Sequence, residues 1–194
     1  MQGILDQFIP KFDIRERFER RVNAPPEIVM KTAYEFDMQS IWPIWLIVNA
    51  RKLILGGTYE RRGRIGMVEE TRQLGWGTLV EESGQLICGA VCQPWFGDVT
   101  FTPIATEKFR DYSEPDLVKI AWTLEADEIE PNVTLFAHEV RAVATDDDAR
   151  KKFLSYWRWA RFGIVAIRWL LLPAVRRQAE REWRAQTDQN ESAG

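Results

Sequence analysis

Residues 133–157 read VTLFAHEVRAVATDDDARKKFLSYW, and the change of pattern inside this stretch decides the fold. Up to Ala144 the residues form two alternating faces, one more apolar than the other, which is typical of a strand. Thr145-Asp146-Asp147-Asp148 then offers a capping oxygen and clustered acids, which favour the start of a helix. The helical pattern continues to about Arg184, with breaks expected at Gly163 and Pro173. The stretch predicts a closing strand that leads directly into a long C-terminal helix.

The chain before this stretch predicts a strand, then helices, then a run of strands. Residues 13–22 have one wholly charged phase, as in a half-buried strand, and Pro25-Pro26 opens the helix that follows. Further helices are expected at about 40–55 and 67–74. Strands are expected at 76–82, 85–93, 98–104 and 117–126, with Ser83-Gly84 as the turn between the first two.

Helices and strands that are segregated along the chain indicate an α+β fold rather than alternating βαβ units. We therefore expect one domain over residues 1–194, in which a curved antiparallel sheet wraps around the long C-terminal helix. Two shorter helices follow the first strand. Residues 185–194 are polar and are expected to form a disordered tail.

Composition excludes several classes of function. The chain has 194 residues, 45% hydrophobic, and a net charge of −3, so it lacks the basic footprint of a nucleic-acid binder. Its most apolar stretch, residues 162–175, is too short for a transmembrane span and contains Arg168 and Pro173. The N-terminus has no signal-peptide pattern, and the two thiols, Cys88 and Cys92, fit a reduced, cytoplasmic setting.

No cofactor motif and no metal site are expected. The chain has a single histidine, and the two cysteines lie too far apart on a strand to form a disulfide. Gly-rich phosphate loops and nucleophile-elbow motifs are missing from the sequence.

A resemblance extends over most of residues 4–182. The order of elements is similar to that of the helix-grip superfamily (SRPBCC), which includes START lipid-transfer domains, birch-pollen-allergen-like proteins and polyketide cyclases. Eight short segments, in five groups, resemble one bacterial branch of it: FDIRER at 12–17 with VNAPP at 22–26, FRDY at 109–112 with EP at 114–115, KIAW at 119–122, EVR at 139–141 with ATD at 144–146, and YW at 156–157. Members of that branch often carry a His where this chain has Phe18. The resemblance implies a cavity between the sheet and the terminal helix, and it implies no particular reaction.

Aromatic residues are the candidates for lining such a cavity. Nine Trp residues are many for a chain of this size, and Trp122 lies on an apolar strand face with Ile120 and Leu124. The further candidates, each of which could equally be ordinary core, are Trp95, Phe101, Phe109, Phe136, Trp157 and Phe162.

His138 is the one side chain whose ordinary pKa lies near neutrality. It shares the more apolar strand face with Phe136 and Val140, so it should point toward the concave side of the sheet together with Trp122. There it would be a polar contact or general base, or else a buried neutral histidine. Glu139 and Arg141 lie on the opposite phase. Cross-strand ion pairs with Lys119 and Glu125 on a solvated face explain them best, and a charged pair inside the cavity is the alternative.

Two basic features allow a second interpretation. Arg61-Arg62-Gly63-Arg64 could attract a phosphate or an anionic lipid, although a solvated loop explains it better. Trp169 with the neighbouring arginines of the terminal helix could make transient contact with a membrane, although a helix gripped by a sheet must bury its apolar stripe.

These observations leave three functions open. The first is binding or carrying a hydrophobic small molecule, lipid-like or aromatic, in the cavity. The second is a cyclase- or dehydratase-type enzyme that uses His138 or a buried carboxylate as acid or base. The third is an interaction module without a ligand. The ligand and the oligomeric state are not fixed by the sequence.

Overall fold

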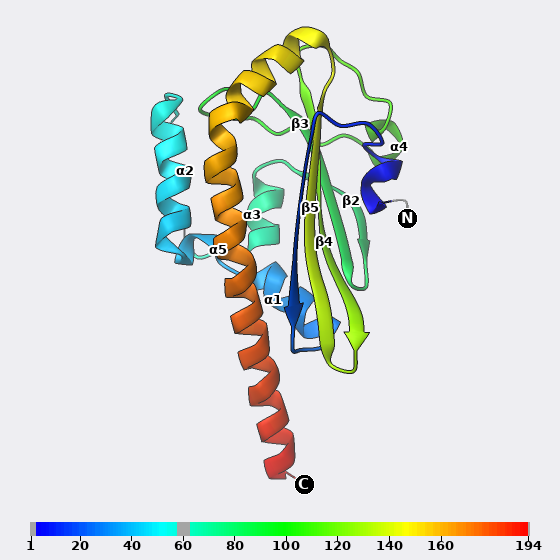
Figure 1. The fold of residues 1–194 in the computed structure, drawn as a ribbon, viewed down its shortest axis with the longest axis vertical. Helices are drawn as coiled ribbons and strands as arrows, with labels where there is room; N and C mark the ends of the chain where they lie inside the picture. Colours follow the sequence, from blue (N-terminus) through cyan, green and yellow to red (C-terminus); the bar gives the residue numbers. More distant parts are fainter. Residues whose placement is uncertain (1–2, 58–62, 194) are drawn as a thin grey trace.

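The sheet joins strands that are far apart in the sequence. The computed structural model describes residues 3–57 and 63–193. The antiparallel sheet has five strands in the order β1-β5-β4-β3-β2. They are β1 (Ile14–Val22), β2 (Gly77–Glu82), β3 (Gln85–Cys92), β4 (Val118–Glu130) and β5 (Val133–Ala144). The first strand therefore lies beside the last, and Figure 1 shows β1 in blue against β5.

Two tight turns set the register of the hairpins. Ser83-Gly84 connects β2 to β3 as predicted, and Gly84 has a φ of 77°, which a residue without a Cβ adopts at little cost. Pro131-Asn132 connects β4 to β5, with Asn132 at a φ of 60°. In this register Trp122 lies opposite Val140. His138 is two positions from Val140, so the side chains of Trp122 and His138 leave the sheet on the same face.

The strand predicted at 98–104 is wrong. Only Thr102 in this segment bridges to the sheet, through two backbone hydrogen bonds with Val91. The pairing stops there because the next residue, Pro103, has no N–H to donate to a ladder.

The helices between the strands follow the prediction closely. α1 (Pro26–Glu35) and α2 (Trp42–Ile54) come after β1, separated by the short helix η2 (Met38–Ser40), and α3 (Met67–Gln73) precedes β2. Gly75, with a φ of 97°, follows the C-terminus of α3. Three short helices were not predicted: η2, η1 (Ile4–Gln7) and α4 (Thr106–Phe109).

The terminal helix α5 (Asp147–Ala193) is longer than predicted. It begins at the predicted place, where an Asp146 side-chain oxygen accepts a hydrogen bond from the Ala149 N–H at 2.8 Å. The predicted breaks at Gly163 and Pro173 do not interrupt it. Gly163 instead lets α2 approach, because a Cβ there would lie 2.9 Å from Ile47. Figure 1 shows that the first turns lean over the sheet before the helix turns downward.

Residues 185–193, expected as part of a disordered tail, continue α5 in the structure. They contain no Gly or Pro until after Ala193, and extending an existing helix fixes only one residue for each hydrogen bond gained. None of the described helices is both long and apolar enough to cross a membrane.

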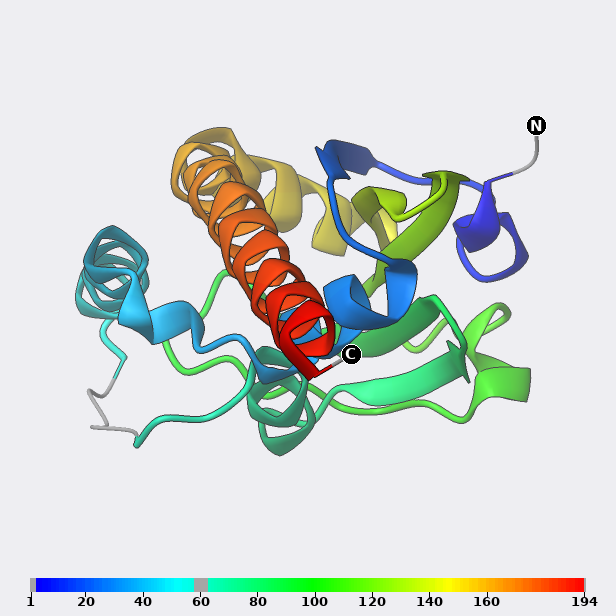
Figure 2. The same cartoon turned by 90° about the horizontal axis from the view of Figure 1, so that it is seen from below.

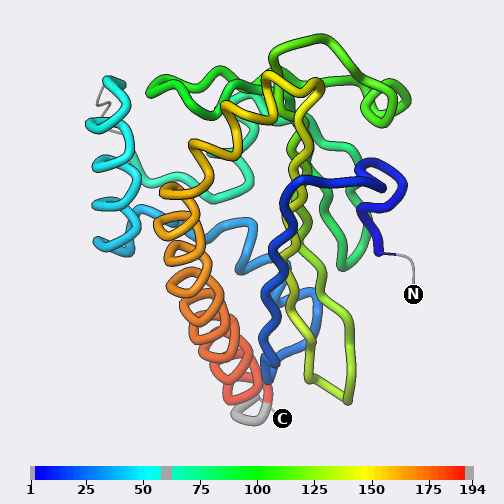
Figure 3. The backbone as a smooth tube through the Cα atoms, turned by 45° about the horizontal axis from the view of Figure 1, so that its top comes forward, coloured from blue at the N-terminus to red at the C-terminus, as the bar shows by residue number. Residues whose placement is uncertain are grey.

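The sheet curves around α5, so the predicted α+β architecture is confirmed. Figure 2 looks along α5 and shows the strands bending around it, with α2 on its far side. Figure 3 shows the same neighbourhood of α2 and the upper part of α5. The main core lies on this concave face, with Val29, Phe136, Leu172 and Val175 among its buried residues.

A second apolar cluster covers the opposite, convex face of the sheet. Leu5, Phe8 and Ile9 from the N-terminal segment pack there against Ile87 and Phe109. Both faces of the sheet are therefore covered near its centre.

Candidate ligand cavity

A cavity of about 900 Å³ lies between the concave face of the sheet and the helices. Its walls come from β4, β5, α2, α3, α5 and the segment 94–101. The sheet contributes alternate residues, whose side chains point to one face: Ile120, Trp122 and Leu124 from β4, and Phe136, His138, Val140 and Ala142 from β5. The alternation of apolar residues along β4 and β5 therefore forms the apolar wall of the cavity that faces α5.

Five of the predicted cavity residues line this space: Phe101, Trp122, Phe136, His138 and Trp157. Three other candidates do not. Trp95 is half-buried and packs against the cluster around Phe153, with Lys152 Nζ 5.6 Å from its ring centroid. Phe109 is fully buried on the convex face, edge-on to Phe8 with ring centroids 6.1 Å apart. Phe162 is 67% exposed on α5.

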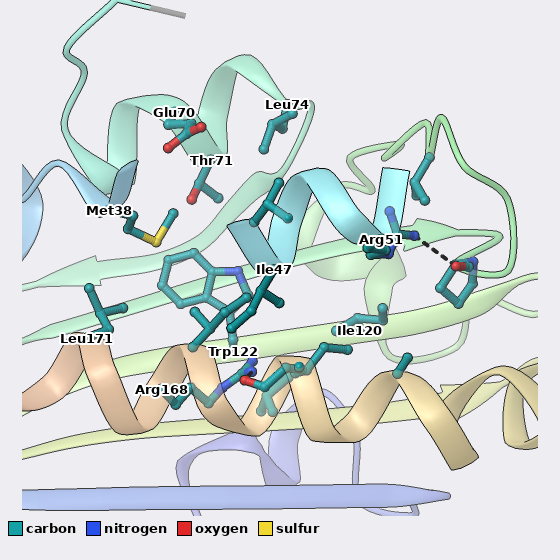
Figure 4. A pocket seen from close by; sticks show the side chains of 18 of the residues that line it. Met38, Ile47, Arg51, Glu70, Thr71, Leu74, Ile120, Trp122, Arg168 and Leu171 are labelled. Carbon is teal, nitrogen blue, oxygen red and sulfur yellow. Dashed lines mark hydrogen bonds between the residues drawn. The ribbon is translucent and has the colours of Figure 1, made fainter. Parts of the chain in front are cut away.

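Aromatic rings form one wall of the cavity. The Trp76 ring lies 4.7 Å from that of Phe101 and 6.2 Å from that of Trp122, measured between centroids. Figure 4 shows the Trp122 indole rising from the sheet into the space between α5 and the helices α2 and α3. Rigid aromatic walls of this kind are common in sites for apolar ligands.

His138 is held as a neutral side chain. Its Nδ1 lies 2.6 Å from the Thr123 carbonyl oxygen. A carbonyl only accepts, so Nδ1 carries the proton and Nε2 is left as an acceptor. Burial, and then the positive charge of Arg168, lower the pKa of His138 to about 3. Because this pKa is far below neutrality, His138 is a weak base at neutral pH.

Arg168 is the functional candidate that sequence reasoning missed. It lines the cavity from α5 next to Trp122 (Figure 4), and its Nη1 donates to the Ile164 carbonyl at 2.9 Å. Its Nε is covered and has no hydrogen-bond partner within residues 3–57 and 63–193. Burial lowers the pKa of Arg168 to about 10, opposed by the negative charge of Glu16, so the guanidinium stays charged at neutral pH. One signal was present: Ile164, Arg168 and Leu172 repeat at four-residue spacing, which puts the arginine on an apolar stripe.

A second arginine in the cavity wall has a structural task. Arg51 of α2 donates to the Pro94 carbonyl at 3.0 Å, the Phe96 carbonyl at 3.2 Å and the Tyr156 hydroxyl at 3.0 Å. These bonds tie α2 to α5 and to the segment around 94–97. The guanidinium of Arg51 is thereby occupied by the protein itself.

The sheet face that carries Glu139 and Arg141 is less exposed to solvent than predicted. The ion pairs are present: Arg141 bonds Glu139 and Asp6, while Arg15 and Arg17 reach Glu139, and Arg17 also reaches Glu125. This face was predicted to be solvated, but only 2% of the Arg141 side chain is exposed. The segment around η1 and the arginines of β1 cover this face and exclude water from it. Glu139 and Arg141 point away from the cavity.

Lys119 belongs to the same buried face. Its Nζ donates to the Arg110 carbonyl at 2.6 Å rather than to a carboxylate, and burial lowers the pKa of Lys119. The predicted cross-strand role of Lys119 is therefore wrong, because the segment after α4 offers it a carbonyl instead.

Apolar side chains rim the cavity where it reaches the surface. Trp45, Val48 and Ile54 of α2 and Trp159 of α5 all line the cavity and are also exposed. Of the basic loop at 61–64, Arg61 and Arg62 lie outside the described residues, while Arg64 is exposed and 3.9 Å from Asp37. Within the described ranges, no group of three or more His, Cys, Asp or Glu side chains is placed to hold a metal ion.

Comparison with known proteins adds no assignment. Neither protein-family models, nor curated proteins, nor solved structures give a match to this chain. The cavity must therefore be interpreted from its own geometry.

Proposed function

We propose that this protein binds and carries a hydrophobic small molecule in the cavity between the sheet and α5. The observation that carries the proposal is the cavity of about 900 Å³ with its largely apolar and aromatic wall. Typical small-molecule sites enclose roughly 300–1,000 Å³ and combine apolar walls with a few polar groups. Membership of the helix-grip superfamily, as the sequence motifs suggest, agrees with this function.

The exposed apolar rim supports a carrier that exchanges its ligand with an apolar surface. Trp45 and Trp159 stand at the edge of the cavity, and amphipathic aromatic residues favour the boundary of a membrane. Transient membrane contact at this rim is part of the proposal.

The enzymatic alternative has less support. His138 does reach the cavity, but its pKa of about 3 leaves it a poor proton acceptor at neutral pH. The two cysteines are no better placed as nucleophiles, since burial raises the pKa of Cys88 and of Cys92 to about 12. An interaction module with a vestigial pocket would leave the size of the cavity unexplained.

Native mass spectrometry and dye binding test the proposal together. Freshly purified protein should carry an added small-molecule mass that organic solvent removes, and the stripped protein should bind Nile red, a neutral apolar dye. Val48→Trp, which adds bulk to the cavity wall from α2, should weaken dye binding. Leu53→Trp is the matched control, because Leu53 lies on the same helix, is 82% exposed and does not line the cavity.

The proposal would be refuted if wild type and Val48→Trp bind the dye equally well and if both purify with the mass of the protein alone, without an added ligand. Circular dichroism of both variants checks that each remains folded.

A further inference from the structure

Arg168 is unlike Arg141, which is buried, and Arg51, which is half-buried as Arg168 is. Arg141 is neutralised by Asp6 and Glu139, and Arg51 is surrounded by three carbonyl oxygens and the Tyr156 hydroxyl. Among the residues that the structure describes, Arg168 bonds only the Ile164 carbonyl of its own helix. No described residue forms an ion pair with it, and its Nε remains without a partner. A charge left so poorly compensated in an apolar wall is costly, which is why buried charges are normally paired.

The surroundings of Arg168 do not supply the missing anion. Glu16 on β1 is the carboxylate whose charge it feels, from beyond ion-pair distance. The neighbouring His138 is neutral and carries no negative charge. Trp122 offers only its ring and an N–H donor. The counter-charge for Arg168 is therefore not provided by the side chains of the wall around it.

The free side of the guanidinium has a defined shape. Nη1 is occupied by the Ile164 carbonyl, which leaves the edge formed by Nε and Nη2. This edge presents two nearly parallel N–H groups, and two parallel N–H groups match the two oxygens of a carboxylate. Nε is covered by neighbouring atoms, so the side chain has to rotate before the whole edge faces the cavity.

We propose that Arg168 binds the head group of an apolar carboxylic acid whose chain occupies the cavity. The inference rests on the proposed ligand-binding function and narrows it to one chemical class. The carboxylate accepts hydrogen bonds from the Nε and Nη2 edge and neutralises the guanidinium, while the chain lies against the aromatic wall around Trp122. One cation matches one negative charge. A phosphate dianion would leave a second charge unneutralised in the same apolar wall.

A competition experiment tests this assignment. Nile red bound to the stripped protein is displaced at neutral pH by dodecanoic acid, by methyl dodecanoate and by dodecyl phosphate, and the dissociation constants are compared. Wild type should bind the acid roughly ten- to a hundred-fold more tightly than the ester, the range expected for a charge-assisted hydrogen-bonded pair. Arg168→Met should bind the acid and the ester equally while still binding the dye.

Two further variants separate the head-group contact from general effects on the helix. Arg168→Lys keeps the charge but loses the planar edge, so it should retain only part of the preference. Arg158→Met removes an exposed arginine from the same helix and should keep the full preference.

Four results would overturn the inference. If Arg168→Met keeps the preference for the acid, or if wild type shows no preference, the head group is not held by Arg168, while dye binding shows that the cavity function survives. If dodecyl phosphate binds more tightly than the acid in an Arg168-dependent way, the carboxylate assignment is wrong. If the wild type binds neither dye nor lipid, the proposed function fails together with this inference.

Discussion

Acidification should destabilise this protein through His138 as the pH falls below the ordinary pKa of histidine. The folded state holds His138 neutral with a pKa of about 3, whereas the ordinary value in an unfolded chain is 6.5. Above this ordinary pKa both states are neutral and His138 contributes nothing. As the pH falls below it, the unfolded state takes up a proton that the folded state rejects, so the free energy of unfolding decreases by about 1.4 kcal/mol per pH unit.

The loss in the free energy of unfolding depends on how far the solution pH lies below the pKa of His138 in the unfolded chain. At about pH 5 the unfolded pKa is about 1.5 units above the solution pH, which corresponds to a loss of about 2 kcal/mol relative to neutral pH. The loss continues until the pH reaches the folded pKa. Glu139 and Asp6, whose pKa values are lowered by their arginine partners, lose their contributions only in more acid solution.

Urea unfolding at a series of pH values measures this loss. Wild type should lose about 2 kcal/mol between neutral pH and about pH 5, and His138→Gln should lose much less over the same range. The chain has one histidine, so an NMR titration of the imidazole reports His138 without ambiguity. A measured pKa near 6.5, or the same acid sensitivity in His138→Gln, would refute the view of His138 as a buried neutral side chain.

Three further substitutions have expected outcomes that urea unfolding can measure. Arg141→Leu removes the closest partner of the buried Glu139, which keeps Arg15 and Arg17, and should cost about 2–3 kcal/mol, whereas a cost below about 1 kcal/mol would mean that water reaches this face. Phe153→Ala should cost about 3–5 kcal/mol because Phe153 is buried in the core, while Trp159→Ala, 41% exposed on the same helix, should cost clearly less. Arg168→Met should raise the free energy of unfolding by about 1 kcal/mol, because it removes a poorly paired charge from an apolar wall, and Arg158→Met should change it by less than about 0.5 kcal/mol. A fall in stability for Arg168→Met would show that the guanidinium is better solvated than its contacts indicate.

The apolar wall of the cavity that faces α5 could be predicted because strand periodicity carries the information. Phe136, His138 and Val140 alternate with charged or small residues, and a period of two places them on one face whatever the details of packing. Trp122 follows from the same argument on β4. The start of α5 could also be predicted, because the residue that caps it, Asp146, is adjacent to it in the sequence.

The covering of the convex face could not be predicted in this way. Leu5, Phe8 and Ile9 belong to a short segment without a clear period, and only tertiary packing brings it across the sheet. The same segment supplies Asp6 to Arg141, which turns an apparently solvated charged face into a buried network. Phe109 was assigned to the wrong face for a related reason, because the connection from β3 to β4 carries it to the convex side.

The role of Arg168 needed the docked position of α5. Its helical stripe is apolar, but a sequence does not say whether a charge on such a stripe meets a carboxylate, a carbonyl or an open space. The same limit applies to Gly163, where a predicted break is instead a point of close approach to Ile47.

The pairing of β1 with β5 fixes the order in which the chain can fold as it leaves the ribosome. Arg15 and Glu139, which bond each other across these strands, are 124 residues apart. The hairpin of β2 and β3 can form during synthesis, whereas β1 has to wait for its neighbour until nearly three quarters of the chain has emerged. Until then β4 presents an unpaired edge, and unpaired edges favour association between chains. Translation that stops before β5 therefore releases a fragment with an open sheet edge and no α5 to cover its concave face.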